Sequence, residues 1–368
     1  MERFEQKVCA VCEHFPISGK IQSVDIIKNG NINKTYCVNT LKENGEMRQY
    51  IVQSINQSVF SNPDHIIENV AGITAHLCGK LLNMPDFKRK VMRIFQSNEG
   101  KYLYSDGQGE YWRVVSYIFN SQCINTPNIF SMEKTGKAFG HFQALLSDYP
   151  ITTLHETIKD FHNTVKRIND LKIACQRDIC GRFTEVQKEC DYIISHDEYI
   201  SFFENEKKSG TIPLRVTHND TKCNNVMFDK DTCEPLAVID LDTVMPGFSA
   251  YDFGDAVRFG ANYADEDEQD LSKVGIDLGL YEAFCKGYIP EVKNNLSMRE
   301  LETLYLGVIA ITIEISARFM TDYLNGDVYF VCRREKHNYY RAMSQIALLK
   351  DEISKIDKLK EISHKYIR

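Results

Sequence analysis

The chain has 368 residues, more than one compact hydrophobic core usually contains, which indicates two domains or lobes. Its 43% hydrophobic and 26% charged residues are typical of a folded globular protein and argue against disorder throughout. The net charge of −7 argues against a large nucleic-acid-binding surface, and no apolar run approaches the roughly 20 residues of a membrane span. We therefore expect neither nucleic acid nor membrane as a partner.

The N-terminal segment and the cysteines favour a cytoplasmic location. Residues 1–15 carry charges throughout and lack the apolar core of a signal peptide. Cys9 and Cys12 form a CxxC pair, but no second tight pair accompanies them, so a zinc site is not indicated. The twelve cysteines are better interpreted as reduced thiols, mostly buried as small apolar side chains.

The first third of the chain is rich in short segments with strand character. Residues 20–28, 35–41 and 49–55 contain β-branched and aromatic residues, and turns with Asn-Gly pairs separate them. A helix is predicted over 61–82, where Ser-Asn-Pro-Asp provides a start signal. Strands then resume at 91–96, 101–104 and 110–119. One helix inserted after the third strand is the plan of a kinase-like N-terminal lobe.

Helical periodicity dominates from residue 129 onward. Amphipathic helices are predicted over 130–146, 152–171, 184–203, 252–263, 280–287, 297–325 and 337–362. The polar stretch 120–128 is a linker candidate. The sequence therefore predicts an α+β, two-lobed protein-kinase-like fold. Its parts are an N-lobe (1–119) with an antiparallel sheet, a linker (120–128) and a mainly helical C-lobe (129–368) that contains a catalytic hairpin at 217–242.

The candidate chemistry lies in residues 214–247. Two short apolar strands, 226–228 and 236–239, flank a turn. Asp220 precedes the first strand, and Asp240 follows the second. The hairpin is therefore expected to bring Asp220, Asn225 and Asp240 to one end of a small sheet.

This arrangement suits phosphoryl transfer. The reaction needs a carboxylate that orients and deprotonates the attacking hydroxyl, and oxygen ligands for the Mg²⁺ that bridges the phosphates of ATP. His218-Asn219-Asp220-x-x-x-x-Asn225 has the spacing of the protein-kinase catalytic loop, so we expect Asp220 to be the base, with Asn225 and Asp240 on the metal. A surface hairpin with ordinary turn residues would account for each Asp singly, but not for the joint pattern.

A literal Asp-Phe-Gly occurs at residues 252–254, after the expected metal ligand. The metal-binding Asp should follow the hairpin strand directly, as Asp240 does. Asp252 instead opens a helical stretch, and a carboxylate there is expected to accept hydrogen bonds from nearby backbone amides. We expect Asp252, together with His218, to support the catalytic loop without contacting the reactants.

The nucleotide-binding side carries a weaker pattern. Residues 30–35 form the only candidate phosphate-covering loop, so Asn31, Asn33 and Thr35 are expected to face the nucleotide. A plain hairpin turn would explain the same residues. Gln53 stands in the third strand near the place where kinases carry a lysine. Because an amide adds no charge, the metal would have to supply more of the charge stabilisation.

Several motifs together carry a family resemblance. They are VTHNDTKCNNVMFD, IDLDTVMPG, YDFGDAVRFGAN, the early GNINKTY and YIVQSINQSVF, and a late group that includes Arg318-Phe319, Asp322-Tyr323-Leu324, Tyr329-Phe330 and His337-Asn338. With these motifs the chain resembles the bacterial N-acetylhexosamine 1-kinases of the aminoglycoside phosphotransferase-like superfamily. The resemblance extends over most of the chain.

The resemblance implies a two-lobed kinase with ATP and Mg²⁺ at the cleft. It further implies transfer of the γ-phosphate to the anomeric hydroxyl of GlcNAc or GalNAc, with Asp220 near the sugar O1. Asp242 becomes an additional metal ligand beside Asn225 and Asp240. Arg318 and Tyr329 are expected to face the sugar, although Arg318 could instead form a surface pair with Asp322, and Tyr329 could be a core aromatic residue.

Other functions stay open at this point. A kinase of the same plan could act on choline, homoserine, another sugar or an aminoglycoside. A nucleotide-binding pseudokinase and a metal-dependent hydrolase are further alternatives, which the intact Asp220, Asn225 and Asp240 set and the two-lobed plan disfavour. The expected partners are a small-molecule sugar and ATP, and the protein is expected to be a monomer or a small homo-oligomer.

Overall fold

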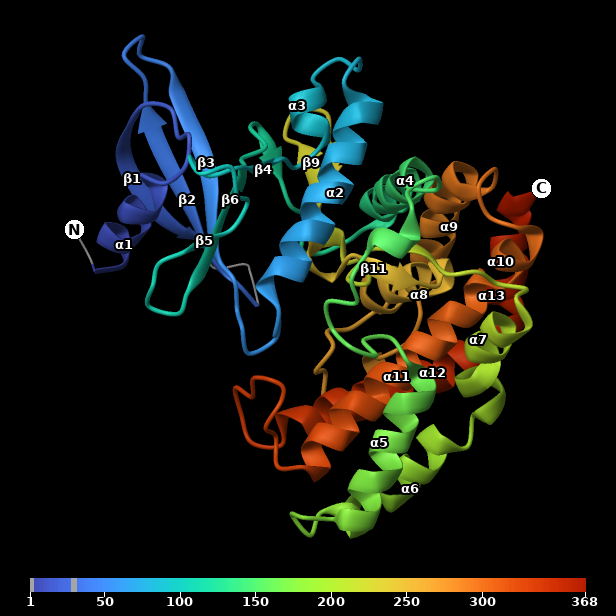
Figure 1. Ribbon diagram of the computed structural model, residues 1–368. Helices are drawn as coiled ribbons and strands as arrows, with labels where there is room; N and C mark the ends of the chain where they lie inside the picture. Colours follow the sequence, from blue (N-terminus) through green and yellow to red (C-terminus); the bar gives the residue numbers. More distant parts are fainter. Residues whose placement is uncertain (1–2, 28–31) are drawn as a thin grey trace. The chain divides into compact units, whose positions relative to one another are not determined.

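The computed structural model describes residues 3–27 and 32–368 (Figure 1). The chain divides into two compact units that are not contiguous in sequence. Unit 1 contains residues 1–123, 148–159 and 226–245, and unit 2 contains residues 124–147, 160–225 and 246–368. The hairpin predicted at 217–242 in the C-lobe is therefore divided at Asn225, because its strands extend a small sheet of unit 1.

Unit 1 contains two antiparallel sheets. The larger has the order β1-β2-β3-β6-β4, with β5 also paired to β6, and the smaller has the order β10-β9-β7. The helices and strands are α1 (Arg3–Cys12), β1 (Lys20–Ile27), β2 (Lys34–Leu41), β3 (Met47–Ser54), α2 (Pro63–Leu81), α3 (Phe87–Lys90), β4 (Ile94–Phe95), β5 (Tyr104–Ser105), β6 (Tyr111–Ser116), β7 (Ser121–Gln122), the 3-10 turn η1 (Ile151–Thr153), β9 (Val226–Asp229), β10 (Pro235–Val238) and the 3-10 turn η3 (Leu241–Thr243).

The core of unit 1 lies between α1 and the large sheet. Val8, Val11 and Phe15 are buried against the sheet side chains Val38 and Trp112. The sequence analysis did not predict α1. Its apolar residues nevertheless recur at helical spacing, and their burial stabilises a helix that the charged terminus alone did not indicate.

The helix α2 begins where its start signal places it. The Asn62 side chain accepts a hydrogen bond from the Asp64 amide, and Pro63 occupies the first turn. Farther along the helix, the Asn69 amide group donates to the carbonyl oxygens of His155 (2.8 Å) and Val244 (3.0 Å). One buried side chain thus ties the segment after the hairpin to α2.

Unit 2 is mainly helical. Its central helix is α11, which packs against α5, α8 and α12 (Figure 1). The elements are α4 (Ile129–Leu145), α5 (Thr164–Arg177), α6 (Phe183–Ile194), α7 (Asp197–Ser209), β8 (Arg215–Thr217), the 3-10 turn η2 (Cys223–Asn225), β11 (Met245–Gly247), α8 (Ser249–Gly260), the 3-10 turn η4 (Leu271–Lys273), α9 (Leu278–Val292), α10 (Met298–Glu302), α11 (Leu304–Leu324), α12 (His337–Ser354) and α13 (Ile356–Ile367).

The predicted fold class is confirmed, but several predicted helices are shorter or interrupted. The helix predicted over 152–171 begins only at Thr164, because the Asn163 side chain caps it through the Lys166 amide. The helix predicted over 297–325 is broken at Thr303. The Thr303 hydroxyl donates to the Arg299 carbonyl oxygen at 2.7 Å, at the end of α10. The non-helical residues before Thr164 include side chains of the candidate site.

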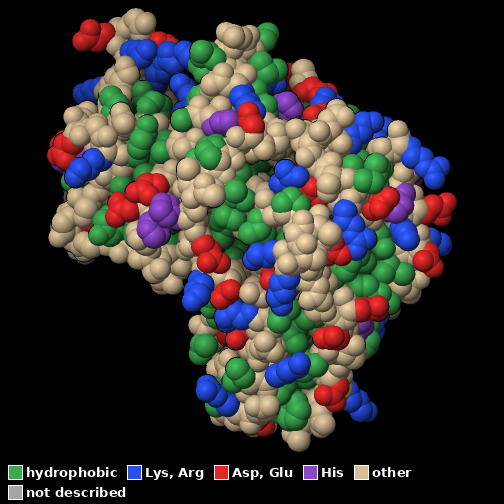
Figure 2. Space-filling view, turned by 45° about the vertical axis from the view of Figure 1, so that its right-hand side comes forward, with side chains coloured by type: hydrophobic (Ala, Val, Ile, Leu, Met, Phe, Trp, Pro, Cys, Tyr) green, Lys and Arg blue, Asp and Glu red, His purple; other side chains and the backbone are tan. Residues whose placement is uncertain are grey.

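Among the described residues, α11 is the one helix long and apolar enough to cross a membrane, and 78% of its most apolar window is buried inside the protein. That burial is what a core helix requires. On the face shown in Figure 2, acidic and basic side chains are intermixed, without a large area of one sign.

Candidate active site

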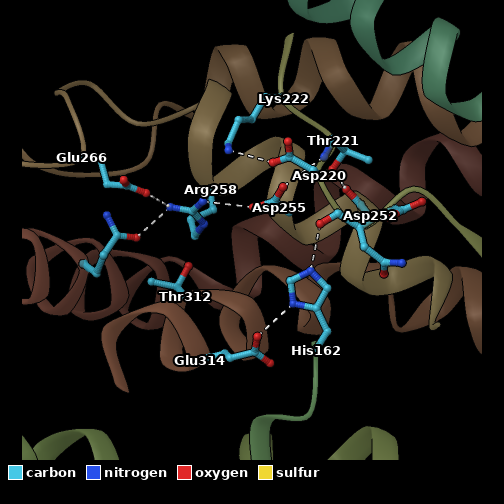
Figure 3. Close-up of polar contacts among 12 residues, drawn as sticks. His162, Asp220, Thr221, Lys222, Asp252, Asp255, Arg258, Glu266, Thr312 and Glu314 are labelled. Atoms are coloured by element: carbon cyan, nitrogen blue, oxygen red, sulfur yellow. Dashed lines mark hydrogen bonds and ion pairs between the residues drawn. The ribbon is translucent and has the colours of Figure 1, made fainter. Parts of the chain in front are cut away.

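The candidate catalytic loop of unit 2 holds the Asp220 carboxylate between two donors. The Lys222 ammonium lies 2.7 Å from Oδ1 (Figure 3), and the Asn225 amide nitrogen donates to Oδ2 at 2.9 Å. The same Asn225 nitrogen donates to the Asp220 backbone carbonyl at 2.8 Å. These contacts fix the carboxylate in one orientation and leave the Asn225 side-chain oxygen as the atom that could coordinate a cation.

The electrostatic surroundings keep Asp220 ionised. Burial acts to raise its pKa, but the charge of Lys222 and the hydrogen bonds outweigh this effect and lower the pKa below the usual range. The adjacent carboxylate correspondingly raises the pKa of Lys222, so this side chain stays protonated. The loop therefore presents a paired carboxylate and ammonium near neutral pH.

The Asp-Phe-Gly sequence lies on α8 and anchors this loop. Asp252 accepts hydrogen bonds from the backbone amides of His218 (2.8 Å) and Asn219 (2.7 Å), the kind of contact expected from its place at a helix start. Burial raises the pKa of Asp252 to about 6. One turn later, Asp255 accepts from the Thr221 amide at 3.1 Å. Two carboxylates on one helix thus hold three amides of the loop.

A buried arginine supports Asp255 from the other side. The Arg258 guanidinium donates to Asp255 at 3.0 Å and to Glu266 at 2.8 Å (Figure 3). Glu266 belongs to the acidic run at residues 265–270. The close approach of α8 to α11 depends on Gly254, where an added Cβ would lie 2.3 Å from the Gly307 carbonyl oxygen.

His218 is fully buried against the rings of Phe139 and Phe142. Its Nδ1 accepts a hydrogen bond from the Asp220 amide at 3.3 Å. The histidine therefore lies behind the catalytic loop, where it can order the Asp220 backbone.

The second acidic pair, Asp240 and Asp242, belongs to unit 1, and its two members differ. Asp240 is exposed and has a left-handed backbone with φ of 61°, which is costly for a residue with a Cβ. Asp242 is buried. Its Oδ1 accepts from Arg113 at 2.5 Å, and its Oδ2 accepts from Asn33 at 2.6 Å. Of these two residues, Asp240 is the one that is exposed on unit 1.

A positive charge lies beside Gln53, on Arg113 of the neighbouring strand. Gln53 on β3 and Arg113 on β6 are cross-strand partners, and the Arg113 Nε donates to the Gln53 side-chain oxygen at 2.9 Å. The Gln53 amide nitrogen donates in turn to the Thr35 hydroxyl at 3.1 Å. A buried guanidinium is thereby fixed beside the position where the sequence offered only an amide.

The other residues expected at the nucleotide are placed as follows. Asn31 lies outside the described residues. Asn33 donates to Asp242, and its side-chain oxygen accepts from the Asn56 amide at 2.9 Å, so both ends of its amide are engaged. The structure thus assigns Asn33 a cross-linking position within unit 1.

The donor chemistry fits a cation at two of the three expected metal ligands. Asp240 offers an exposed carboxylate, and Asn225 offers an amide oxygen. Asp242 does not fit, because Arg113 and Asn33 already engage its two oxygens. Residues 3–27 and 32–368 contain no group of three or more His, Cys, Asp or Glu side chains that could hold a metal ion.

Arg318 lies against three aromatic rings of unit 2. Its guanidinium carbon is 5.3 Å from the centre of the Phe161 ring, 5.5 Å from Phe330 and 6.0 Å from Tyr329. Among the described residues no carboxylate lies within ion-pair distance of Arg318, so the surface pair with Asp322 is absent.

Asp322 instead holds the loop that carries two of these rings. Its carboxylate accepts from the backbone amides of Val328 (2.9 Å), Tyr329 (2.8 Å) and Phe330 (2.9 Å). The Asn338 side chain donates to the same carboxylate at 2.8 Å. Tyr329 is 61% exposed, so it is not a core aromatic residue.

A second arginine, Arg167 on α5, adds to the positive charge around Arg318. Its guanidinium donates to the Phe161 carbonyl at 3.1 Å, and its Nε is buried without a hydrogen-bond partner. Burial and the like charge of Arg318 lower the pKa of Arg167. Arg167 also lies 3.9 Å from the Asp170 carboxylate. The side chains around Arg318 form an aromatic-walled group with two guanidiniums, which we call the Arg318 group: Phe161, Arg167, Arg318, Tyr329 and Phe330.

Sequence reasoning missed several of these residues. Lys222 stood two residues after Asp220 in the same motif, where its charge could have been noticed. Phe161 and Arg167 lay inside a segment predicted as one continuous helix, so nothing marked them. Arg113 could be found only by the strand register, because cross-strand pairing is not encoded locally.

Comparison with known proteins decides the family. A model of the phosphotransferase enzyme family (APH) matches residues 23–286, more than half of the chain. The chain belongs to this family. It is therefore a phosphotransferase, and its fold is the protein-kinase-like fold of the aminoglycoside phosphotransferases.

Similar solved structures cover nearly the whole chain at low identity. They include the amicoumacin kinase hAmiN in complex with AMP-PNP and Ca²⁺ (TM-score 0.58, 15% identity, 98% of this chain and 93% of that chain). A microcompartment-associated aminopropanol kinase matches with a TM-score of 0.58 and 16% identity, over 97% of this chain and 99% of that chain. Choline kinase from Cryptosporidium parvum Iowa II matches with a TM-score of 0.58 and 12% identity, over 98% and 99%. At these identities the likeness establishes the fold.

Proposed function

We propose that this phosphotransferase is a small-molecule kinase that transfers the γ-phosphate of ATP to the anomeric hydroxyl of an N-acetylhexosamine, GlcNAc or GalNAc. The sugar 1-phosphate would be the product. The observation that carries the proposed acceptor class is the Arg318 group, with its two guanidiniums and, among residues 3–27 and 32–368, no carboxylate within ion-pair distance of Arg318. The motifs THND and IDLDT support the same acceptor class through their resemblance to N-acetylhexosamine 1-kinases.

In the proposed reaction, Asp220 accepts a hydrogen bond from the anomeric hydroxyl and takes its proton as the oxygen attacks the γ-phosphorus. Its lowered pKa keeps it ionised and ready to accept the proton at neutral pH. The ammonium of Lys222, 2.7 Å from the Asp220 carboxylate, would stabilise charge on the transferring phosphoryl group. In unit 1, Arg113 is the cross-strand partner of Gln53, which stands where kinases carry a lysine.

Mg²⁺ would neutralise charge on the phosphate oxygens, and we propose Asp240 and Asn225 as the residues that hold it. Their roles differ. Asp240 would supply an anionic ligand, while Asn225 would supply a neutral oxygen and at the same time orient Asp220.

The charge of the Arg318 group disfavours acceptors that are cations. Choline and aminopropanol, named in similar structures, carry a positively charged nitrogen, and aminoglycosides carry several. An aromatic cage can bind a quaternary ammonium group, but here Arg318 already lies against the three rings. A guanidinium fork matches the hydroxyls and the acetamido carbonyl of a neutral N-acetyl sugar.

The acceptor proposal is tested by the release of ADP from Mg²⁺-ATP with GlcNAc, GalNAc, glucose, choline, homoserine and kanamycin. We expect turnover with the N-acetyl sugars and an anomeric phosphate in the phosphorus NMR spectrum. Turnover confined to choline or kanamycin would disprove the proposed N-acetylhexosamine acceptor, but the protein would still be a small-molecule kinase. ATP binding without turnover on any acceptor would favour the pseudokinase alternative.

Replacing Arg318 by Met should weaken acceptor binding selectively. Met keeps much of the apolar contact with the rings but removes the fork, so we expect KM for GlcNAc to rise about 10- to 100-fold with KM for ATP little changed. A matched control is Arg334→Met, an exposed arginine paired with Asp267. Equal KM values for GlcNAc in the wild type and Arg318→Met would remove Arg318 from the acceptor site.

Replacing Asp240 by Ala should weaken metal-dependent nucleotide binding. The change removes the exposed carboxylate, which is the proposed anionic ligand. It also places Ala in a left-handed backbone conformation that Asp adopts more readily. We expect the Mg²⁺ concentration for half-maximal ATP binding to rise by at least about tenfold, measured by calorimetry in a Mg²⁺ titration. An unchanged titration curve would exclude Asp240 as a ligand. Asp231→Ala, on the turn between β9 and β10, is the control.

A further inference from the structure

His162 lies between the catalytic loop and α11, and both of its ring nitrogens face acceptors. Nδ1 is 2.9 Å from the Glu314 carboxylate, and Nε2 is 3.1 Å from the Asn219 carbonyl oxygen (Figure 3). A carbonyl oxygen can only accept, so Nε2 must carry a proton. An ionised carboxylate also only accepts, which requires a second proton on Nδ1.

The residue that His162 contacts is under backbone strain. Asn219 immediately precedes Asp220 and has φ of 64°, in the left-handed region. Its amide donates to Asp252, its side-chain oxygen accepts from Thr217 at 3.0 Å, and its carbonyl faces His162. A left-handed residue persists when its surroundings determine it, and these three contacts do so.

We propose that His162 is a positioning residue of the phosphoryl-transfer site, which as an imidazolium paired with Glu314 holds the carbonyl of Asn219 and thereby the strained loop that carries Asp220. The proposal rests on the proposed role of Asp220 as the base. It links α11, which carries Glu314 and Arg318 one turn apart, to the catalytic carboxylate.

The neighbouring charges support the charged form. Burial opposes it, but the adjacent carboxylate of Glu314 outweighs burial and raises the pKa of His162 above its usual range. The Thr164 hydroxyl donates to the second Glu314 oxygen at 3.2 Å, which favours the ionised carboxylate. The charged and titratable groups that face His162 from the packed elements are Glu314 and Arg318 on α11 and Tyr251, Asp252 and Asp255 on α8.

The sign of the pH dependence follows from the raised pKa. The stabilising pair is present at low and neutral pH and is lost as the pH rises through the raised pKa of His162. After deprotonation the one remaining ring proton of His162 stays on Nδ1, where it is donated to the Glu314 carboxylate. The Nε2 lone pair then faces the Asn219 carbonyl oxygen. Two acceptors then oppose one another, and the loop loses a constraint. Activity should therefore decline on the alkaline side with the midpoint of this histidine.

Glu314→Gln separates charge from hydrogen bonding. The Gln amide can donate to Nδ1 while its oxygen accepts from Thr164, so a neutral imidazole keeps its proton on Nε2 and still donates to Asn219. We expect this variant to lose the alkaline decline that belongs to His162. The Gln side chain of His162→Gln has a single terminal amide, so it cannot contact both Glu314 and Asn219 as the two ring nitrogens do. We expect kcat to fall about tenfold or more, with KM for ATP little changed.

The experiment combines histidine ¹⁵N NMR with kinetics on the full chain. The His162 signals, assigned by their absence in His162→Gln, should show both nitrogens protonated at pH 7.5 and a midpoint equal to that of the kcat decline. In Glu314→Gln they should show a neutral ring with its proton on Nε2. A surface pair of the same type, His141 and Glu291 at 3.3 Å, provides matched Gln variants that should change neither readout.

Three results would overturn the proposal. One is a neutral His162 at pH 7.5 in the wild type, which would mean that Glu314 carries the proton. Another is an alkaline decline that is unchanged in Glu314→Gln. The third is a His162→Gln variant with lower melting temperature but normal kcat, which would make the residue purely structural. If none of the acceptors is phosphorylated, the proposed function fails on its own, while the NMR titration still decides the protonation of His162.

Discussion

Asp220→Asn should reduce kcat by about 10²–10⁴-fold while ATP and sugar binding largely survive. The Asn side chain has the same shape but only one oxygen, so it can keep the contact with Lys222 or with Asn225 but not both. The Asp220 backbone carbonyl still accepts from Asn225, which helps to keep the loop ordered. What disappears is the group that accepts the proton of the attacking hydroxyl. The measurement is single-turnover transfer at saturating substrates, together with calorimetric binding of each substrate.

The control for this change is Asp197→Asn, at an exposed position in the first turn of α7. It removes one carboxylate of the same unit without touching the loop, and its kcat should equal that of the wild type. A kcat close to normal in Asp220→Asn would disprove the role of Asp220 as the base. The pH profile adds a second check: because the pKa of Asp220 is lowered, activity should persist as the pH falls to the usual Asp range and be lost below it.

Asp242→Asn should destabilise the protein strongly, by about 3–5 kcal/mol. The side chains of Asp242 and Arg113 are 3% and 1% exposed, so the substitution leaves a guanidinium buried without its counter-charge. Urea unfolding measures this loss. Replacing both partners by apolar residues, as in Arg113→Met with Asp242→Leu, should restore much of the stability, because no buried charge is then left unpaired.

This prediction also separates two roles for Asp242. A metal ligand would change the Mg²⁺ requirement of Asp242→Asn with little effect on unfolding. The structure instead supports a structural role, since Arg113 and Asn33 engage the two carboxylate oxygens. The control is Asp270→Asn, which removes an exposed ion pair with Lys273 and should cost at most about 1 kcal/mol.

Much of the fold follows from local sequence signals. The strands around the Asn-Gly turns and the start of α2 at Asn62 are present as predicted, because turn chemistry and helix caps act over a few residues. The helix α1 and the non-helical stretch before Thr164 were not predicted. The first depends on burial against the sheet, and the second on a single capping side chain within an otherwise helical pattern.

The sequence by itself determined the fold class and located the candidate catalytic motif, because the spacing of His218, Asp220 and Asn225 is local. Only the tertiary structure decided how Asp240 differs from Asp242, since that depends on Arg113 more than a hundred residues away. The tertiary structure likewise brought three rings to Arg318, and His162 between Glu314 and Asn219. Charge pairing and aromatic contact depend on distance in space, whereas the sequence records only distance along the chain.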